Sequence, residues 1–304
     1  METVHEPVLL HEVLEAFAPA LGRSDAWYLD GTLGGAGHAL AVARAFKGKV
    51  NIVGLDQAPD AIARNEKLLR GAAKSVILER SNFRDLDKVL DSHGITAVDM
   101  ILLDLGISSD ELETSGRGFS FQKDEPLHMT MADPATAPFT AMAIVNDWNE
   151  EDIANVVFAY GEERYARRIA KSICIYRSKK KIETSGELAE IVKSAVPPFR
   201  RGKIHPATKT FQALRIAVND ELGALREGLA KGYARLNEGG RMAVISFHSL
   251  EDRIVKDFDK KQALSGGVIL TKKPITASAQ ELAENPRSRS AKLRIIEKHS
   301  HSKK

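Results

Sequence analysis

The stretch from Tyr28 to His38 constrains the fold more than any other part of the chain. Its apolar start, followed by four glycines, is typical of a strand that runs into a glycine loop, and a helix is expected over residues 39–46. Glycines let the backbone turn sharply beside a ligand, and a helix start offers unpaired N–H groups to an anionic group. The stretch therefore predicts an α/β fold with a nucleotide-like ligand at this loop, although an ordinary tight turn has the same pattern.

The second expected strand, residues 50–55, narrows the class of ligand. It ends at Asp56, where a carboxylate can bind both ribose hydroxyls of NAD or of S-adenosylmethionine. No register of residues 31–40 gives the G-x-G-x-x-G spacing of dinucleotide sites, and no phosphate-binding G-x-x-x-x-G-K-[ST] motif follows. The observed D-x-T-x-G-x-x-G loop has to hold only a methionine carboxylate and amine, which favours S-adenosylmethionine.

The alternation of strands and helices continues along the chain. Further strands are expected at residues 75–78, 98–103, 242–247, 268–270 and 293–296, which would complete a sheet of seven strands. The apolar run 98–103 is typical of a central parallel strand that is covered on both faces. Asp104 ends it, at the edge where ligands bind in open α/β sheets. Ser108, Ser109 and Asp110 are available to cap the next turn, so a functional role is favoured for Asp104.

Two other residues follow expected strands. Phe83 comes after the probable N-cap Asn82, and it has two equally supported interpretations, a packing contact at a helix start or a lid over an adenine ring. His248 ends the strand 242–247. Isolated histidines are usually local hydrogen-bonding groups, but its place on the same sheet edge as Asp56 favours substrate contact. Residues 249–252 are expected to form the capping box of the following helix.

An inserted helical domain is expected at residues 111–207, between two parts of the sheet domain, 1–110 and 208–304. The pattern in residues 137–195 is helical, and an aromatic loop with Phe119 and Phe121 precedes it. In the helix after residue 208, three polar side chains share a face. They are Gln212, Arg215 and Asn219. Such a face is usually solvated, but close to the returning insertion it could also face substrate.

Composition limits the setting of the protein. A chain of 304 residues with 43% hydrophobic content suggests about two globular domains. The single cysteine, Cys174, excludes an internal disulfide and lies in an apolar helical stretch, so it is not expected to act as the nucleophile that pyrimidine C5 methylation needs. The acidic N-terminus is not a signal peptide, and no apolar run approaches 18 residues. We expect a cytoplasmic protein without a membrane partner.

The net charge is only +3, but the basic residues gather in clusters. These are Arg177, Lys179, Lys180 and Lys181, then Arg200, Arg201 and Lys203, then Arg287, Arg289, Lys292 and Arg294. Such runs are usually solvated surface, and clustering makes nucleic acid an additional interpretation.

Taken together, these segments resemble the ribosomal RNA small subunit methyltransferase H family along nearly the whole chain. The matching stretches are residues 7–14, 30–38, 103–109, 118–121, 160–169, 205–219, 245–256 and 285–294. The resemblance implies methylation, with S-adenosylmethionine as cofactor, of the exocyclic N4 of a cytidine in the decoding region of 16S ribosomal RNA. It also implies a class I methyltransferase fold, a Rossmann-like seven-stranded sheet, with an inserted helical substrate-recognition domain.

The same resemblance assigns the cofactor site. Its contacts fall on Ala36, Gly37, His38, Asp56, Phe83, Asp104 and Glu111. The family usually has glutamine at position 111, so the Glu111 carboxylate could repel the methionine carboxylate or accept from its ammonium. A second departure is His128 and Thr130, where the family tends to have aspartate and arginine. The ion pair that would order this loop is therefore not expected here.

The chemistry requires an acceptor beside the target amine. Asp104, or the backbone carbonyls of Leu105 and Gly106, could accept from N4 and guide its proton away, and no metal is required. A target base has to be unstacked, which suggests walls of a base pocket. The residues expected to bind substrate are Phe119, Phe121, Arg215, His248, Arg287 and Arg289. The arginines and the basic runs of the insertion would hold RNA phosphates.

Several alternatives stay open. The RNA could be free or within the small ribosomal subunit, and the enzyme could be a monomer or a homodimer. The same scaffold could methylate another exocyclic amine. A non-catalytic ribosome assembly factor could bind S-adenosylmethionine as a structural ligand. A nicotinamide-dependent oxidoreductase has the least support, because the G-x-G-x-x-G spacing is missing.

Overall fold

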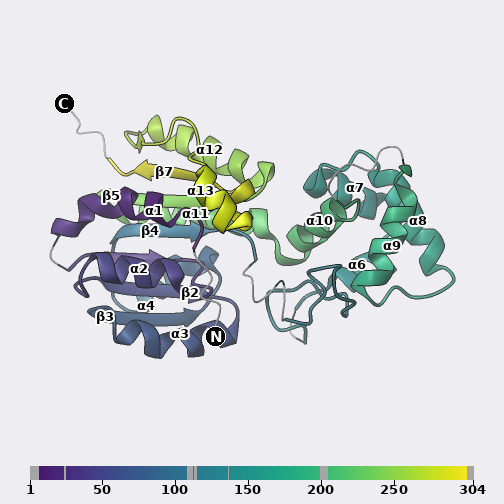
Figure 1. Ribbon diagram of the computed structural model, residues 1–304, viewed down its shortest axis with the longest axis horizontal. Coiled ribbons are helices and arrows are strands. Elements are labelled where there is room, and N and C mark those ends of the chain that lie inside the picture. The colour runs from purple at the N-terminus through teal and green to yellow at the C-terminus, as the bar shows by residue number, and fades with distance from the viewer. Residues whose placement is uncertain are drawn as a thin grey trace. The chain divides into compact units, whose positions relative to one another are not determined.

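The chain folds into two compact units. The computed structural model describes residues 7–23, 25–107, 112, 115–135, 137–198 and 205–299. The first unit comprises residues 1–106 and 222–304, and the second comprises residues 107–221 (Figure 1). Each unit is described by itself.

The first unit is built on a mixed sheet. Its strands in the described residues are β1 (Trp27–Asp30), β2 (Asn51–Asp56), β3 (Ser75–Arg80), β4 (Val98–Asp104), β5 (Leu236–Ser246), β6 (Val268–Ile269) and β7 (Lys292–Glu297). Their order is β3-β2-β1-β4-β5-β7-β6, visible in Figure 1 as a stack of arrows. Strand β7 runs antiparallel to β5 and β6, whereas the pairs among β1 to β5 are parallel.

The seven predicted strands are confirmed to within about two residues, with one exception. Strand β5 begins at Leu236, six residues before the predicted start at Met242. It pairs Leu236 with Val98 and then resumes regular pairing only at Arg241 with Met100. The extra residues between these pairs form a bulge, where Gly239 has a φ of +69°. A glycine-rich segment that looks like a turn can thus continue a strand.

Helices cover both faces of the sheet. Those of the first unit are α1 (Leu10–Phe17), α2 (Gly37–Ala45), α3 (Pro59–Arg70), α4 (Leu86–Ser92), α11 (Glu221–Ala234), α12 (Ser249–Ala263) and α13 (Ala279–Glu284), with Glu221 counted in the second unit. Tyr28 and Met100 join the apolar core that contains α1 and α2, whereas their neighbours Leu29 and Ile101 join the core that contains α4 and α11. Because side chains alternate along a strand, burial of both faces requires continuous apolar runs.

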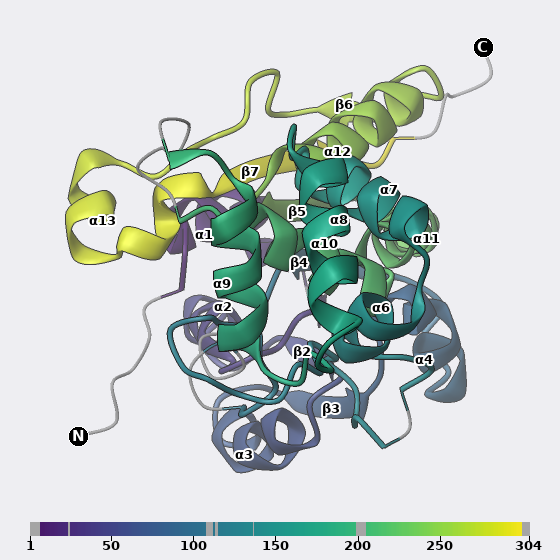
Figure 2. The ribbon, with the colours of Figure 1, turned by 90° about the vertical axis from the view of Figure 1, so that its right-hand side faces the viewer.

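The second unit is helical. Its helices in the described residues are α6 (Ala141–Asp147), α7 (Glu150–Gly161), α8 (Ala166–Arg177), α9 (Ser185–Ala195) and α10 (Thr208–Asn219), labelled in Figure 2. They share a separate apolar core, to which α8 contributes Ile169 and α10 contributes Leu214. The return to the sheet domain was expected at residue 208, whereas α10 packs with the second unit and the division falls after Glu221. None of the helices in the described ranges is both long and apolar enough to cross a bilayer.

Candidate cofactor and substrate site

The glycine loop after β1 has the backbone conformation that its composition requires. Gly34 and Ala36 have φ values of +49° and +58°, in the left-handed region. Gly31 is needed for close approach, because a Cβ at this position would lie 2.4 Å from Leu103 Cδ2. Helix α2 starts at Gly37 without a side-chain cap. The loop therefore brings backbone and the start of α2 to the carboxyl edge of the sheet.

Two side chains hold this loop in place. Asp56 Oδ2 accepts from Gly34 N at 2.8 Å, and its Oδ1 accepts from Ala58 N at 2.8 Å. Burial raises the pKa of Asp56, and these backbone hydrogen bonds oppose that rise. On the other side, the buried Asn65 donates to Gly34 O at 2.7 Å. The sequence analysis did not identify Asn65 as a residue that binds the loop. The one sequence signal for this role is a polar residue on the buried face of α3.

A buried acidic group lies under the loop. Asp30 is 2% exposed, and its carboxylate accepts from Tyr28 Oη at 2.9 Å and from Thr32 N at 3.2 Å. Burial raises the pKa of Asp30 to about 6, against the effect of the nearby His38. His38 Nε2 in turn lies 3.6 Å from Asp104 Oδ2. Two carboxylates at the ends of β1 and β4 thus flank one imidazole.

Several polar atoms of this group make no hydrogen bond among the described residues. Both ring nitrogens of His38 and Oδ1 of Asp104 are buried and make no hydrogen bond. Asp104 itself is held by its backbone, since its N–H donates to Thr32 Oγ1 at 2.7 Å. Buried polar atoms in native proteins almost always have partners. These atoms therefore fit the polar methionine end of a cofactor.

Phe83 packs against helix α11, in agreement with one of the two interpretations of this residue. A Cβ on Gly228 of α11 would lie 2.5 and 2.9 Å from Phe83 ring atoms, so the ring lies flush against that glycine. Phe83 is partly exposed, and the short 3₁₀ turn Phe83–Asp85 begins with Asn82 accepting from Arg84 N at 3.0 Å. Contact with adenine stays a prediction.

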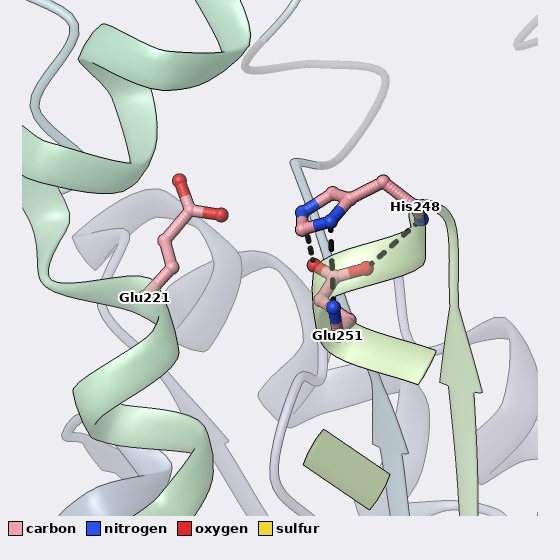
Figure 3. A group of neighbouring side chains, drawn as sticks. All are labelled: Glu221, His248 and Glu251. Atoms are coloured by element: carbon pink, nitrogen blue, oxygen red, sulfur yellow. Dashed lines mark hydrogen bonds and ion pairs between the residues drawn. The ribbon is translucent and has the colours of Figure 1, made fainter. Parts of the chain in front are cut away.

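His248 caps helix α12 (Figure 3). Its Nδ1 accepts from Glu251 N at 3.4 Å, while Glu251 Oε2 accepts from Phe247 N at 2.8 Å and from His248 N at 3.3 Å. The capping box was predicted at residues 249–252, but it is formed by His248 and Glu251 and so begins one residue earlier. The cause is the backbone, because His248 is extended, with φ −140° and ψ 166°, as an N-cap must be. His248 has a structural role, and substrate contact is untested.

The polar face of α10 is engaged within the second unit. Arg215 donates twice to Glu221, at 2.8 and 2.9 Å, and Figure 3 shows Glu221 at the start of α11. Gln212 donates to Tyr160 O at 3.1 Å. Asn219 donates to Met129 O and accepts from Met131 N, both at 2.8 Å. These three side chains form hydrogen bonds with neighbouring segments of the second unit, which argues against the predicted substrate-facing role of Arg215.

The two phenylalanines of the aromatic loop differ in their burial. Phe119 is 6% exposed in the apolar core of the second unit, which argues against its predicted place in the wall of a base pocket. Phe121 is partly exposed, stacks on His205 at 4.5 Å and meets Phe211 edge to face at 5.1 Å. Phe121 thus keeps part of its ring accessible.

The loop at residues 126–131 is ordered by bonds to its backbone. Arg117 Nη1 donates to Thr130 O at 3.2 Å and to Met131 O at 2.9 Å, and Asn219 binds both sides of Thr130. A side-chain ion pair between positions 128 and 130 is not needed for this arrangement. The substitutions His128 and Thr130 are therefore compatible with an ordered loop.

The basic clusters separate into buried and exposed members. Arg294 is 5% exposed and binds Asp252 at 2.7 Å, with Lys292 3.5 Å from the same carboxylate. Arg287 and Arg289 are exposed on the 3₁₀ turn Pro286–Ser290. Four further predicted residues lie outside the described residues, namely Glu111, Arg200, Arg201 and Lys203.

The strand order, with one antiparallel strand and a glycine loop after β1, is that of the class I methyltransferases. Acidic residues end β1, β2 and β4 at the edge where this class binds its cofactor, S-adenosylmethionine. The chain belongs to the MraW methylase family, whose model matches residues 2–299, and it is a methyltransferase.

Known relatives span nearly the whole chain. A protein of Deinococcus deserti named ribosomal RNA small subunit methyltransferase H is 49% identical over 97% of this chain and 93% of its own length. Its namesake in Heliobacterium modesticaldum is 46% identical over 97% of this chain and 98% of its own length. Among solved structures, an rRNA methylase from Streptococcus thermophilus covers 97% of this chain and 98% of its own, with 11% identity and a TM-score of 0.47.

Proposed function

We propose that this methyltransferase transfers a methyl group from S-adenosylmethionine to the exocyclic N4 of a cytidine in the decoding region of 16S ribosomal RNA. The observation that carries the proposal is the match, over 97% of the chain, to proteins named ribosomal RNA small subunit methyltransferase H. The match includes the inserted unit as well as the sheet. The N4 position and the decoding region rest on the resemblance of the motifs.

The cofactor is held along the carboxyl edge of the sheet. Ala36, Gly37 and His38 hold its methionine end, Asp56 its ribose and Phe83 its adenine. Neither ring nitrogen of His38 makes a hydrogen bond within the described residues, and the loop backbone is left-handed at Ala36. Both observations support the assignment of this loop to the methionine end of the cofactor. Asp56 accepts from Gly34 N and Ala58 N through different oxygens and is partly exposed, so its carboxylate can also accept from a ribose hydroxyl. Glu111 is assigned to the methionine end from the sequence alone.

Catalysis is mainly alignment of the target amine. The bound cofactor supplies an electrophilic methyl group, and proximity of the two reactants can contribute roughly 7–11 kcal/mol. Cytosine N4 is a poor nucleophile because its lone pair is delocalised into the ring. Asp104 accepts a hydrogen bond from this amine and takes up its proton when the methyl group is transferred. His38 at 3.6 Å and Thr32 on the Asp104 N–H fix the position of the carboxylate. The Leu105 and Gly106 carbonyls are the alternative acceptors.

The RNA contributes an unstacked base and its phosphates. Phe121 in the second unit and His248 in the first are each proposed to contact the substrate RNA, because each keeps some exposure. Arg287 and Arg289 are exposed and suited to phosphates. The proposed partner is 16S ribosomal RNA within the small subunit, and the proposed compartment is the cytoplasm, where a lone Cys174 stays reduced. A homodimer is a further proposal for its assembly.

The proposal is tested with labelled S-adenosylmethionine and small ribosomal subunits from a strain that lacks the activity. Nucleoside mass spectrometry should find N4-methylated cytidine. Asp104→Asn should lower kcat by about 10²–10⁴-fold, the usual contribution of a positioned proton acceptor, and cofactor affinity is measured in parallel because Asp104 is also assigned to the cofactor site. Methylation of a different amine would refute the N4 assignment.

Undiminished transfer by Asp104→Ala would remove Asp104 from the mechanism and leave the backbone carbonyls as acceptors.

A further inference from the structure

Helix α8 carries a row of basic side chains on its outer face. At 100° per residue, Arg164, Arg167, Arg168, Lys171 and Lys179 fall within about one third of the helix circumference when the helical path is continued past both ends. All five are exposed, whereas Ile169 and Ile173 on the opposite face are buried. We call these five residues the α8 cationic stripe. Residues four apart on a helix lie about 6 Å apart along its axis.

The stripe has no acidic partner in the described part of the chain. Its members appear in no ion pair, and the segment Ala166–Arg177 contains neither aspartate nor glutamate. Other cations of the second unit are engaged. Lys193 binds Glu190 at 2.9 Å, Lys180 binds Glu187, and Lys209 donates to Glu162 O at 3.0 Å. Like charges at i and i+4 destabilise a helix, so folding does not explain the stripe.

A groove adjoins the stripe between α8 and α9. Its volume is about 230 Å³, and it is lined by Ser172, Ile175, Tyr176, Lys179, Ile191 and Ser194. Lys179 belongs to both features. Ile175, 52% exposed, lies between the cations of the stripe. Proteins that bind single-stranded nucleic acid combine a positive track for the backbone with aromatic and apolar surfaces for the bases.

We propose that the α8 cationic stripe and this groove bind a single-stranded segment of the substrate RNA, with its phosphates along the stripe and a base against Tyr176. The inference rests on the proposed function and names the surface that holds the RNA. Charge complementarity argues for it, because unpaired guanidinium groups suit phosphate oxygens. Two hydroxyls and a tyrosine in the groove suit a nucleotide better than an acidic peptide.

The test measures binding of the full-length protein to a fluorescein-labelled single-stranded RNA 20-mer at several KCl concentrations. Arg168→Gln with Lys171→Gln removes two stripe charges. A matched control, Lys193→Gln with Lys209→Gln, removes two engaged charges from the same unit. The slope of log K against log salt should fall by about 1.4 for the stripe variant, at about 0.7 per phosphate contact, with affinity about tenfold weaker at 0.15 M salt. The control should match the wild type.

Further variants separate the remaining explanations. Arg168→Lys with Lys171→Arg keeps both charges and should keep the slope, and unchanged thermal melting shows that the variants fold. Equal slopes for stripe and control variants would overturn the proposal. So would a loss of binding to small subunits without a loss on naked RNA, which would indicate a ribosomal protein as partner. Wild-type methyl transfer is measured in parallel. If methyl transfer is absent but the stripe variant has the reduced slope, only the proposed function is refuted. If methyl transfer is present but the stripe and control variants have equal slopes, only the RNA-binding role of the α8 cationic stripe is refuted.

Discussion

Asp259 on α12 offers the sharpest quantitative prediction for the first unit. Its side chain is 3% exposed, and its Oδ2 has no hydrogen-bond partner among the described residues. Burial raises the pKa of Asp259 to about 7, and the negative charge of Asp252 adds to the rise while Arg294 opposes it. The folded protein therefore binds this proton more tightly than the unfolded chain does.

The sign and size follow from proton linkage. With a folded pKa of about 7 and an unfolded value of 3.8, the contribution of Asp259 is fully present below pH 3.8 and is lost as the pH rises through 7. The difference between these two pKa values corresponds to about 4 kcal/mol of folding free energy. Between pH 5 and pH 8.5, the loss should be roughly 2.5–3 kcal/mol. Asp259→Asn mimics the protonated acid, so its stability gain over the wild type should grow by this amount.

The assay is urea unfolding followed by the fluorescence of Trp27, which lies in β1 of the first unit. Trp148 is replaced by phenylalanine in every variant, since it is the only other tryptophan and belongs to the second unit. Asp257→Asn is the matched control, because Asp257 is exposed on the same helix. A gain for Asp259→Asn that is the same at pH 5 and pH 8.5 would show that Asp259 does not carry a raised pKa.

Three further predictions concern the loops and the cofactor. Gly118→Ala should destabilise the second unit by about 2 kcal/mol or more, because Gly118 has φ +72° and a Cβ would lie 2.5 Å from Pro126 O; unfolding followed by Trp148 fluorescence that stays within 0.5 kcal/mol of wild type contradicts this. Gly228→Ala should displace the Phe83 ring and weaken S-adenosylmethionine binding several-fold in calorimetry, and unchanged affinity would place Phe83 outside the adenine site. Glu111→Gln should keep the fold and tighten cofactor binding, whereas equal or weaker binding would show that its carboxylate does not repel the ligand.

Local patterns were enough to predict most of the sheet. The strands around Leu29 and Ile101 are apolar on both faces, and that property is visible in a run of a few residues. The glycine loop was predictable for the same reason, because a left-handed conformation at Gly34 is favoured by its residue type. Asp56 and Asp104 follow from position, since they end strands that the pattern identifies.

What the sequence did not show depends on contacts that form only in the folded chain. Arg215 looked available on its helix face, but Glu221, six residues later, binds it across the turn between α10 and α11. Phe119 looked like an exposed aromatic until the fold buried it. His248 was assigned to substrate because a capping role usually falls to serine or threonine, and Ser249 was adjacent. In each case the residue type alone did not show the tertiary or backbone contact that the side chain makes.

Three acids end parallel strands, and their positions alone do not show which of them accepts a hydrogen bond from the target amine. Their exposure and their existing hydrogen bonds distinguish them. Asp30 is enclosed, with Tyr28 and Thr32 on its oxygens. Asp56 is occupied by the backbone of the loop that it orders. The Asp104 side chain is 26% exposed, and its Oδ1 has no partner among the described residues. The Asp30 and Asp56 carboxylates each accept at least two hydrogen bonds, whereas Asp104 Oδ1 accepts none from the described residues, so Asp104 is the acid best suited to accept from an incoming amine.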